Sequence, residues 1–207
     1  MAPIKSCAAL LIGCLLAGGA ASAQSVVPNG ADTAVTTIDG THQITGGTLS
    51  QDGENLFHSF EQFGLSTAET ANFVTQPNVL NVVGRINGGS PSVINGQLEL
   101  TGSTANLFLL NPVGVIFGPD ATLALPRDLN VSTADGLMFT DDTLDVVGTP
   151  DYASLVGRPT GLVFRLSSPG AVINTADLSL GADSALTLAG STVVSTGTVS
   201  AGEVAIA

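Results

Sequence analysis

A repeat of 21 residues near the C-terminal end of the sequence restricts the fold more than any other feature. Residues 172–181 align with residues 193–202, and both follow the pattern apolar, apolar, polar, Thr, small, polar, apolar, Ser, apolar, Gly. Residues 93–100 are a looser copy, with one residue fewer between the two apolar runs. Periods of about 20 residues are typical of solenoids, and the unit contains no helical run. The repeat therefore predicts a β-solenoid whose coils stack their apolar side chains inward.

Most of the remaining sequence shows short apolar alternations separated by Gly, Asn, Asp and Pro, which is typical of all-β architecture. Strands are expected at residues 80–83, 97–100, 107–110, 115–117 and 186–188. The best helical candidate is short, at residues 66–73. Because stacked coils stabilise each other, a charge placed at Ile173 or Val194 is expected to disrupt two coils at once.

The first 23 residues have the composition of an export signal. Lys5 gives a short positive region, residues 7–20 are apolar and small, and residues 21–23 read Ala-Ser-Ala. A small-residue motif of this kind is a signal-peptidase site, so we expect cleavage between Ala23 and Gln24. The apolar stretch is too short to span a bilayer, and no transmembrane segment is expected in the mature chain.

Removal of this signal changes the chemistry of the chain. Cys7, Cys14 and Lys5 leave with it, so four arginines remain against 17 acidic residues. A chain without cysteine cannot be trapped by a periplasmic disulfide, which suits export in an unfolded state. The negative charge argues against nucleic acid and anionic membrane surfaces as partners. One alternative stays open, because Leu-Ile-Gly-Cys at residues 11–14 resembles a lipobox that would make Cys14 a lipid anchor.

Residues that could support catalysis or bind a metal are few and scattered. Only His42 and His58 are histidines, and the mature chain has no cysteine, so a zinc site lacks ligands. Asp141 and Asp142 are adjacent, which is more typical of a solvated turn than of a calcium site or a glycosidase pair. No nucleophile-elbow motif is present. We therefore expect no enzyme activity, no metal and no cofactor.

The segment Asn111-Pro112-Val113-Gly114 predicts a turn from physical chemistry alone. Pro112 has a fixed φ that suits the second position of a turn, Gly114 tolerates positive φ, and the Asn111 side chain can accept a hydrogen bond from the backbone that follows it. This turn is expected to form a corner of a coil, and a role in secretion is compatible with that position.

Three segments resemble a known family. Residues 56–63 read Leu-Phe-His-Ser-Phe-Glu-Gln-Phe, residues 79–96 contain Asn-Val-Val-Gly-Arg-Ile-Asn-Gly-Gly and Pro-Ser-Val-Ile-Asn-Gly, and residues 105–118 read Ala-Asn-Leu-Phe-Leu-Leu-Asn-Pro-Val-Gly-Val-Ile-Phe-Gly. From about Val35 to Leu180 the chain resembles the haemagglutination-activity domain, the N-terminal module of filamentous-haemagglutinin-type exoproteins secreted by the two-partner (type Vb) route. The chain departs from the family at Val113, where the family usually has Asn.

The resemblance implies a right-handed parallel β-helix with an N-terminal cap and extra-helical strands. It divides the chain into a signal peptide (1–23), a two-partner secretion domain (24–170) and the start of a β-helical repeat region that continues in a longer protein (171–207). The secretion-signature residues implied by it are Asn111, Pro112, Val113 and Gly114. The residues of its structural motifs are Phe57, His58, Ser59, Phe60, Phe63, Asn95 and Gly96. The three phenylalanines are expected to pack as core or cap aromatics, with His58 in a structural role.

The implied function is that of a secretion domain. An outer-membrane barrel transporter would recognise it through periplasmic domains, and the domain would nucleate the folding of a surface adhesin whose ligand, a protein or a carbohydrate, is unknown. The expected location is the cell surface or the medium, reached through the periplasm. Two alternatives remain: a stand-alone or autotransporter-type surface binding protein, and a polysaccharide-degrading β-helix enzyme.

Overall fold

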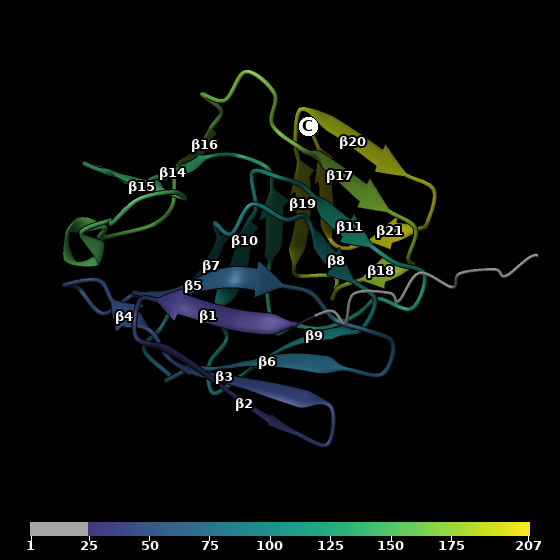
Figure 1. The fold of residues 1–207 in the computed structure, drawn as a ribbon, viewed down its shortest axis with the longest axis horizontal. Coiled ribbons are helices and arrows are strands. Elements are labelled where there is room, and N and C mark those ends of the chain that lie inside the picture. Colours follow the sequence, from purple (N-terminus) through teal and green to yellow (C-terminus); the bar gives the residue numbers. More distant parts are fainter. Residues whose placement is uncertain (1–24) are drawn as a thin grey trace, which may run out of the picture.

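The computed structural model describes residues 25–207, which form twenty-two strands and one short 3-10 turn, η1 (Tyr152–Ser154). Most strands pair in parallel and wind around a common core, from the N-terminal strands at the bottom of Figure 1 to the yellow strands at the top. The arrangement confirms the predicted all-β fold and the predicted parallel β-helix.

Three parallel sheets form the walls of the coils. Sheet A consists of β5 (Asn55–Phe63), β7 (Asn81–Ile86), β10 (Asn106–Leu110), β13 (Leu129–Ser132), β19 (Ala185–Ala189) and β22 (Glu203–Ile206). Sheet B consists of β3 (Thr41–Gly46), β6 (Thr70–Val74), β9 (Gln97–Thr101) and β12 (Thr122–Ala124), followed by the pair β18 (Leu178–Ser179) and β21 (Val199–Ser200). Sheet C consists of β8 (Ser92–Ile94), β11 (Val115–Phe117), β17 (Ala171–Asn174) and β20 (Thr192–Ser195). The chain passes from sheet A to sheet C to sheet B and back, so the six parallel strands of sheet A mark six coils.

Strand pairing accounts for the 21-residue repeat. Val172 pairs with Val193 in sheet C, and Leu178 pairs with Val199 in the pair that follows sheet B. The looser copy is displaced by one position, because Ser92 and not Val93 is level with Val115, the partner of Val172. The repeat in the sequence therefore corresponds to one coil, and its last two copies are aligned as the sequence predicts.

The inward position in these coils is the first apolar residue of each pair. Val172 is fully buried and Val193 packs against the core, whereas Ile173 is partly exposed and Val194 is 45% exposed. The expectation that a charge at Ile173 or Val194 would enter the core is therefore wrong. When two adjacent residues of a strand are both apolar, the sequence does not show which of them points into the core. A shift of one residue exchanges the buried and the exposed face.

Antiparallel strands cover the first coil, as the predicted N-terminal cap requires. β1 (Val26–Gly30) and β4 (Thr48–Leu49) both pair with β5, and β2 (Thr33–Ile38) pairs with β3. Figure 1 shows β2 at the bottom of the stack and β1 directly below β5. β1 and β2 therefore pair with the edges that the first parallel strands would otherwise leave free, and they become the edge strands at this end.

The predicted helix at residues 66–73 is wrong. Residues 67–68 form a turn, in which Ala68 has a φ of +66°, and β6 begins at Thr70. The apolar residues at the end of this segment, Ala71 and Phe73, point into the core of the coils. Tertiary packing overrides a weak local helical preference here.

An extra-helical arm, residues 133–170, separates β13 from β17. It carries the antiparallel strands β14 (Gly136–Met138), β15 (Thr143–Asp145) and β16 (Gly161–Val163), and it lies beside the coils at the upper left of Figure 1. The extra-helical strands are thus confirmed. The arm packs on the outward side of sheet A and forms a second core there.

Successive side chains along the strands of sheet A point alternately into the coils and toward the arm, so the same strands contribute to both cores. On β10, Leu107 and Leu109 point into the coils, whereas Leu110 belongs to the second core. The second core joins residues of sheet A to residues of the arm: Phe57, Val83, Leu110, Ala134, Leu137, Phe139, Leu144, Val146 and Leu155. Sheet A therefore has a core on each face where the arm covers it, one inside the coils and one beneath the arm.

Candidate functional site

The secretion-signature segment forms a tight turn between sheets A and C. Gly114 N donates to Asn111 O at 3.1 Å, and Val113 N donates to the Asn111 Oδ1 at 3.0 Å. Gly114 has a φ of +141°, which favours glycine at this position. Asn111 and Pro112 are buried, while the Val113 side chain is 42% exposed. The corner therefore presents one apolar side chain at the surface.

Asn111 also connects this turn to its neighbouring coils. Its Nδ2 donates to Ser90 O and Ser92 Oγ, both at 3.0 Å, and its backbone N donates to Ser132 O on β13. Gly170 N, at the end of the arm, donates to Pro112 O at 2.7 Å. One short segment thus holds together the coil before it, the coil after it and the returning arm.

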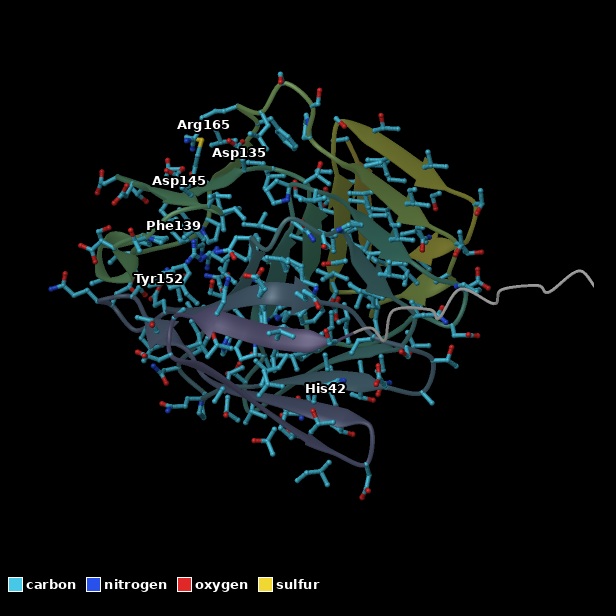
Figure 2. The ribbon with its side chains drawn as sticks, viewed as in Figure 1. His42, Asp135, Phe139, Asp145, Tyr152 and Arg165 are labelled. Carbon is cyan, nitrogen blue, oxygen red and sulfur yellow. The ribbon has the colours of Figure 1, made fainter. Side chains whose placement is uncertain are left out.

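The structural-motif phenylalanines lie on both sides of sheet A. Phe60 and Phe63 point into the first coil, where their ring centroids are 5.1 Å apart and both rings contact Phe73. Phe57 points outward and contacts the rings of Phe139 and Tyr152 on the arm, at 5.9 and 5.0 Å (Figure 2). Phe57 therefore joins the cap region to the arm.

His58 is fully buried against Phe60 and Phe73. Its Nδ1 lies 3.3 Å from Thr33 Oγ1, and its Nε2 has no hydrogen-bond partner among residues 25–207. Burial lowers the pKa of His58 from 6.5 to about 4, because the charged imidazolium is poorly solvated there. A neutral, enclosed imidazole of this kind has no access to a substrate.

The two remaining polar motif positions form connections between coils. Ser59 is buried, and its Oγ donates to Asn29 Oδ1 of β1 at 2.8 Å. Asn95 Nδ2 donates to Thr67 Oγ1 and Asp120 Oδ2, which lie in the coils on either side. Gly96 lies against Glu69 O so closely that a Cβ there would collide with it.

A row of asparagines, not anticipated from the sequence, runs along the outward face of sheet A. Asn106 Nδ2 donates to Asn81 Oδ1 at 2.9 Å, and Asn81 Nδ2 donates to Asn55 Oδ1 at 2.8 Å. Asn55 Nδ2 then donates to Leu155 O and Gly157 O of the arm. The sequence contained a signal for this row, because each asparagine is the first residue of a largely apolar strand and the three recur at intervals close to the coil length.

Arg85 is a second residue whose role the sequence left unassigned. It is buried on the outward face of β7, and its Nη1 donates to Val146 O at 2.8 Å and Gly148 O at 3.0 Å of the arm. Its guanidinium also lies over the Tyr152 ring, 5.7 Å from the centroid. The available signal was a single arginine inside an otherwise largely apolar strand. Because a buried charge needs specific partners, such an arginine indicates a contact with another part of the chain.

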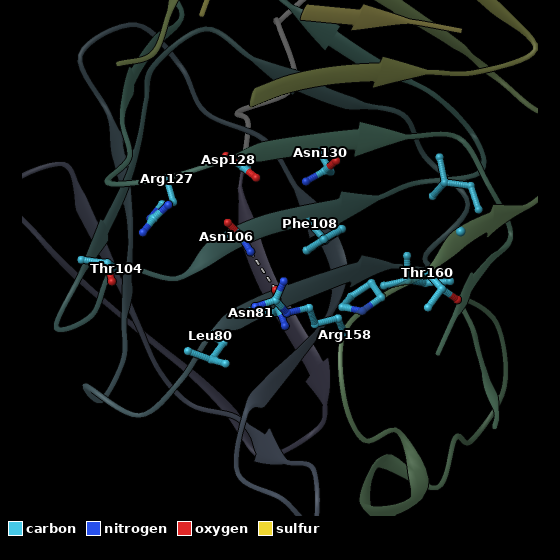
Figure 3. Close-up of a pocket in the computed structure, with 14 residues that line it drawn as sticks. Leu80, Asn81, Thr104, Asn106, Phe108, Arg127, Asp128, Asn130, Arg158 and Thr160 are labelled. Carbon is cyan, nitrogen blue, oxygen red and sulfur yellow. Dashed lines mark hydrogen bonds between the residues drawn. The ribbon is translucent and has the colours of Figure 1, made fainter. Parts of the chain in front are cut away.

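A polar cavity of about 550 Å³ lies between the outward face of sheet A and residues 158–162 of the arm (Figure 3). Asn81, Asn106 and Asn130 line it from three neighbouring strands, and Arg158 reaches into it from the arm. Arg127, which precedes β13, lies at the opposite side. No pattern in the sequence indicates that these residues lie together.

The exposed carboxylates of the arm make local contacts. Asp142 accepts hydrogen bonds from Ser154 Oγ and Thr143 N, which lower the pKa of its carboxyl. Arg165 Nη2 pairs with Asp145 Oδ1 at 2.6 Å, and Asp135 lies nearby (Figure 2). Residues 25–207 contain no group of three or more His, Cys, Asp or Glu side chains placed to hold a metal ion.

The expected signal cleavage between Ala23 and Gln24, and the open question about Cys14, fall outside the described residues. From residue 25 onward, the structure has no helix with the length and apolarity needed to cross a membrane.

Comparison with known proteins assigns the family. The family described as the TPS secretion domain matches residues 18–207. A solved structure, the crystal structure of a filamentous hemagglutinin secretion domain, is similar over 88% of this chain and 97% of that chain, with a TM-score of 0.46 and 15% identity. No curated protein matches the chain. Since the family match covers nearly the whole chain, the protein belongs to the family of TPS secretion domains, the N-terminal domains of two-partner secretion exoproteins.

Proposed function

We propose that the Asn111–Gly114 turn is the export determinant of this domain, and that the periplasmic domains of the cognate outer-membrane transporter recognise the segment that contains it. The observation that supports this role is the convergence of three segments on the turn: β8, β13 and the end of the arm all donate to it or accept from it. The exposed side chain at Val113 gives a partner an apolar contact at the same corner.

The domain further acts as the starting template of the β-helix once it emerges outside the cell. Its cap strands close one end of the stack, and each later coil adds to the edge of the coil before it. In solenoids each repeat is stabilised mainly by its neighbours, so a closed first coil determines where folding begins. The exoprotein is then an adhesin at the cell surface or in the medium, and its ligand is a protein or a carbohydrate.

The domain division belongs to the same proposal: a signal peptide at residues 1–23, the secretion domain at 24–170 and the start of the repeat region at 171–207. The end of the arm at residue 170 supports the second boundary. Beyond it the paired positions in sheet C are 21 residues apart, as in Val172 and Val193. Before the boundary this spacing is absent. Val115 of β11 pairs with Val172 of β17, and the whole arm lies between these two residues in the sequence.

Export of variants with the co-expressed transporter tests the role of the turn. Asn111→Ala removes the three side-chain hydrogen bonds, and Gly114→Ala places a Cβ on a backbone that favours glycine. We expect both to reduce the exported fraction at least tenfold, measured by immunoblotting of medium and cells. Val147→Ala, which shortens an exposed valine of the arm outside the turn, is the matched control for the loss of an apolar surface side chain.

A second control separates the turn from general stability. Ile44→Ala empties part of the core in β3, which lies in another sheet and another coil than the turn, and it is expected to lower the free energy of unfolding while export stays near the unmodified level. Normal export of Asn111→Ala and Gly114→Ala would contradict the proposed determinant. A loss of export that follows stability across all the variants would contradict it equally.

A further inference from the structure

The cavity beside the asparagine row has the dimensions of a binding site. Its volume of about 550 Å³ falls within the range of small-molecule sites in proteins. Strands β7, β10 and β13 form its floor through their outward residues, and the arm forms its opposite wall (Figure 3). Because the arm forms one wall, the cavity exists only in the folded domain. None of the lining residues belongs to the Asn111–Gly114 turn, so the two sites are separate.

The positive charges of the domain are distributed unevenly around this cavity. Arg165 is paired with Asp145, and Arg85 is held by carbonyls of the arm. Arg127 and Arg158 are exposed, make no hydrogen bond or ion pair within residues 25–207, and both line the cavity. In a chain with 17 acidic residues, two unpaired guanidinium groups at one cavity favour an anionic ligand. Guanidinium groups bind carboxylates through paired hydrogen bonds.

The remaining lining contains groups that bind hydroxyls. Asn106 Oδ1 and the Asn130 amide have no hydrogen-bond partner among the described residues, although Asn106 Nδ2 is engaged with Asn81. Thr104 and Thr160 add hydroxyl groups at two sides of the cavity, although the Thr160 hydroxyl already donates to Met138 O at 3.3 Å and is left to accept. Amides and hydroxyls both donate and accept hydrogen bonds, as sugar hydroxyls do.

Two further features narrow the class of ligand. Asp128 lines the cavity as well, and its Oδ1 accepts from Ala185 N at 2.8 Å. A carboxylate at the rim disfavours a doubly charged phosphate, and it can accept a hydrogen bond from a hydroxyl. Phe108 is half-buried on the floor and offers an apolar ring to the C–H face of a sugar. We infer that this cavity binds a saccharide that carries carboxylate groups, with Arg127 and Arg158 holding carboxylates at opposite sides of the cavity and the asparagines holding the hydroxyls.

The test compares three probes by isothermal titration calorimetry on the purified chain: trigalacturonate, its methyl ester and a triglutamate peptide. The ester keeps the sugar rings and removes only the charge, whereas the peptide keeps the charge and removes the sugar. We expect trigalacturonate to bind at least tenfold more tightly than either of the other probes, and its binding to weaken as salt is added. Equal affinity for the ester, tighter binding of the peptide or no binding of trigalacturonate would overturn the inference.

Variants locate the binding on the chain. Arg127→Gln and Arg158→Gln are expected to weaken trigalacturonate at least tenfold each, and a circular-dichroism melt checks that the variants remain folded. Arg165→Gln, which removes the same charge from another part of the arm, is the matched control and is expected to bind like the unmodified chain. If Arg165→Gln weakens binding as much as the cavity variants do, the effect is one of net charge and the assignment to this cavity is wrong.

Discussion

At the residue scale, His58 is a buried ionisable group whose protonation opposes folding. Burial lowers its pKa in the folded chain to about 4, whereas an unfolded chain has the ordinary value near 6.5. Between these two values the unfolded state binds a proton that the folded state does not. The contribution of His58 to the free energy of unfolding is therefore fully present above pH 6.5, decreases as the pH falls toward 4 and changes no further below that.

We expect the His58 contribution to reduce the free energy of unfolding by about 3 kcal/mol between pH 7 and pH 4. Urea denaturation at both pH values measures this decrease in the unmodified chain and in His58→Gln, which cannot titrate. Carboxylates also titrate in this range, so the readout is the difference in pH dependence between the two proteins. An unchanged dependence in His58→Gln would refute the assignment.

At the scale of single elements, the direction of a strand's side chains decides what a substitution costs. Val172 and Ile173 are neighbours on β17, but Val172 is fully buried in the coil and Ile173 is partly exposed. An aspartate at position 172 would lie without a partner in the core, which costs several kcal/mol. At position 173 the same side chain can reach water.

We therefore expect Val172→Asp to lower the midpoint of thermal unfolding by more than about 10 °C, and Ile173→Asp by only a few degrees. Circular-dichroism melts of the two variants measure the difference, and each serves as the control for the other because they introduce the same charge one residue apart. Equal destabilisation by both would mean that β17 is not held in the register that pairs it with β11 and β20.

The same strand shows how far sequence reasoning reaches. The repeat predicted the coil, and the pairing of Val172 with Val193 follows from it. Which of Val172 and Ile173 points into the core could not be predicted, because both are apolar and alternation cannot distinguish them. At residues 66–73 a helical spacing misled the prediction, because Phe73 is placed by the core of the first coil rather than by its neighbours in sequence.

The candidate sites differ in the same way. The Asn111–Gly114 turn is local, so Pro112, Gly114 and the Asn111 side chain were sufficient to anticipate its geometry. The contacts of Arg85 with the arm join residues about sixty positions apart, and the cavity depends on how the arm docks. Alternation and turn chemistry contain no information about contacts between residues far apart in the sequence. Neither the contacts of Arg85 nor the cavity could therefore be predicted.

At the scale of the whole molecule, sheet A links the two cores. Leu109 points into the coils and Leu110 points toward the arm, and both are buried on the same strand. The arm is also held by Arg85 and Asn55, which come from the first coils. Because the arm packs on three strands of sheet A, β5, β7 and β10, it should not unfold while the coils stay intact.

The single tyrosine of the chain makes this coupling measurable. Tyr152 lies on the arm, stacked on Phe57, so its fluorescence reports on the arm, while far-ultraviolet circular dichroism reports mainly on the sheets of the coils. We expect urea transitions followed by the two signals to coincide, as they do in a cooperative unit.

Leu109→Ala and Leu110→Ala form the matched pair for this test, since they empty neighbouring positions in the two different cores. Each should cost about 2–5 kcal/mol, and each should move both signals together. Separate transitions in the unmodified chain, or a Leu110→Ala variant in which only the tyrosine signal shifts, would show that the arm is an independent module. In that case the cavity between the arm and sheet A could open without unfolding of the coils.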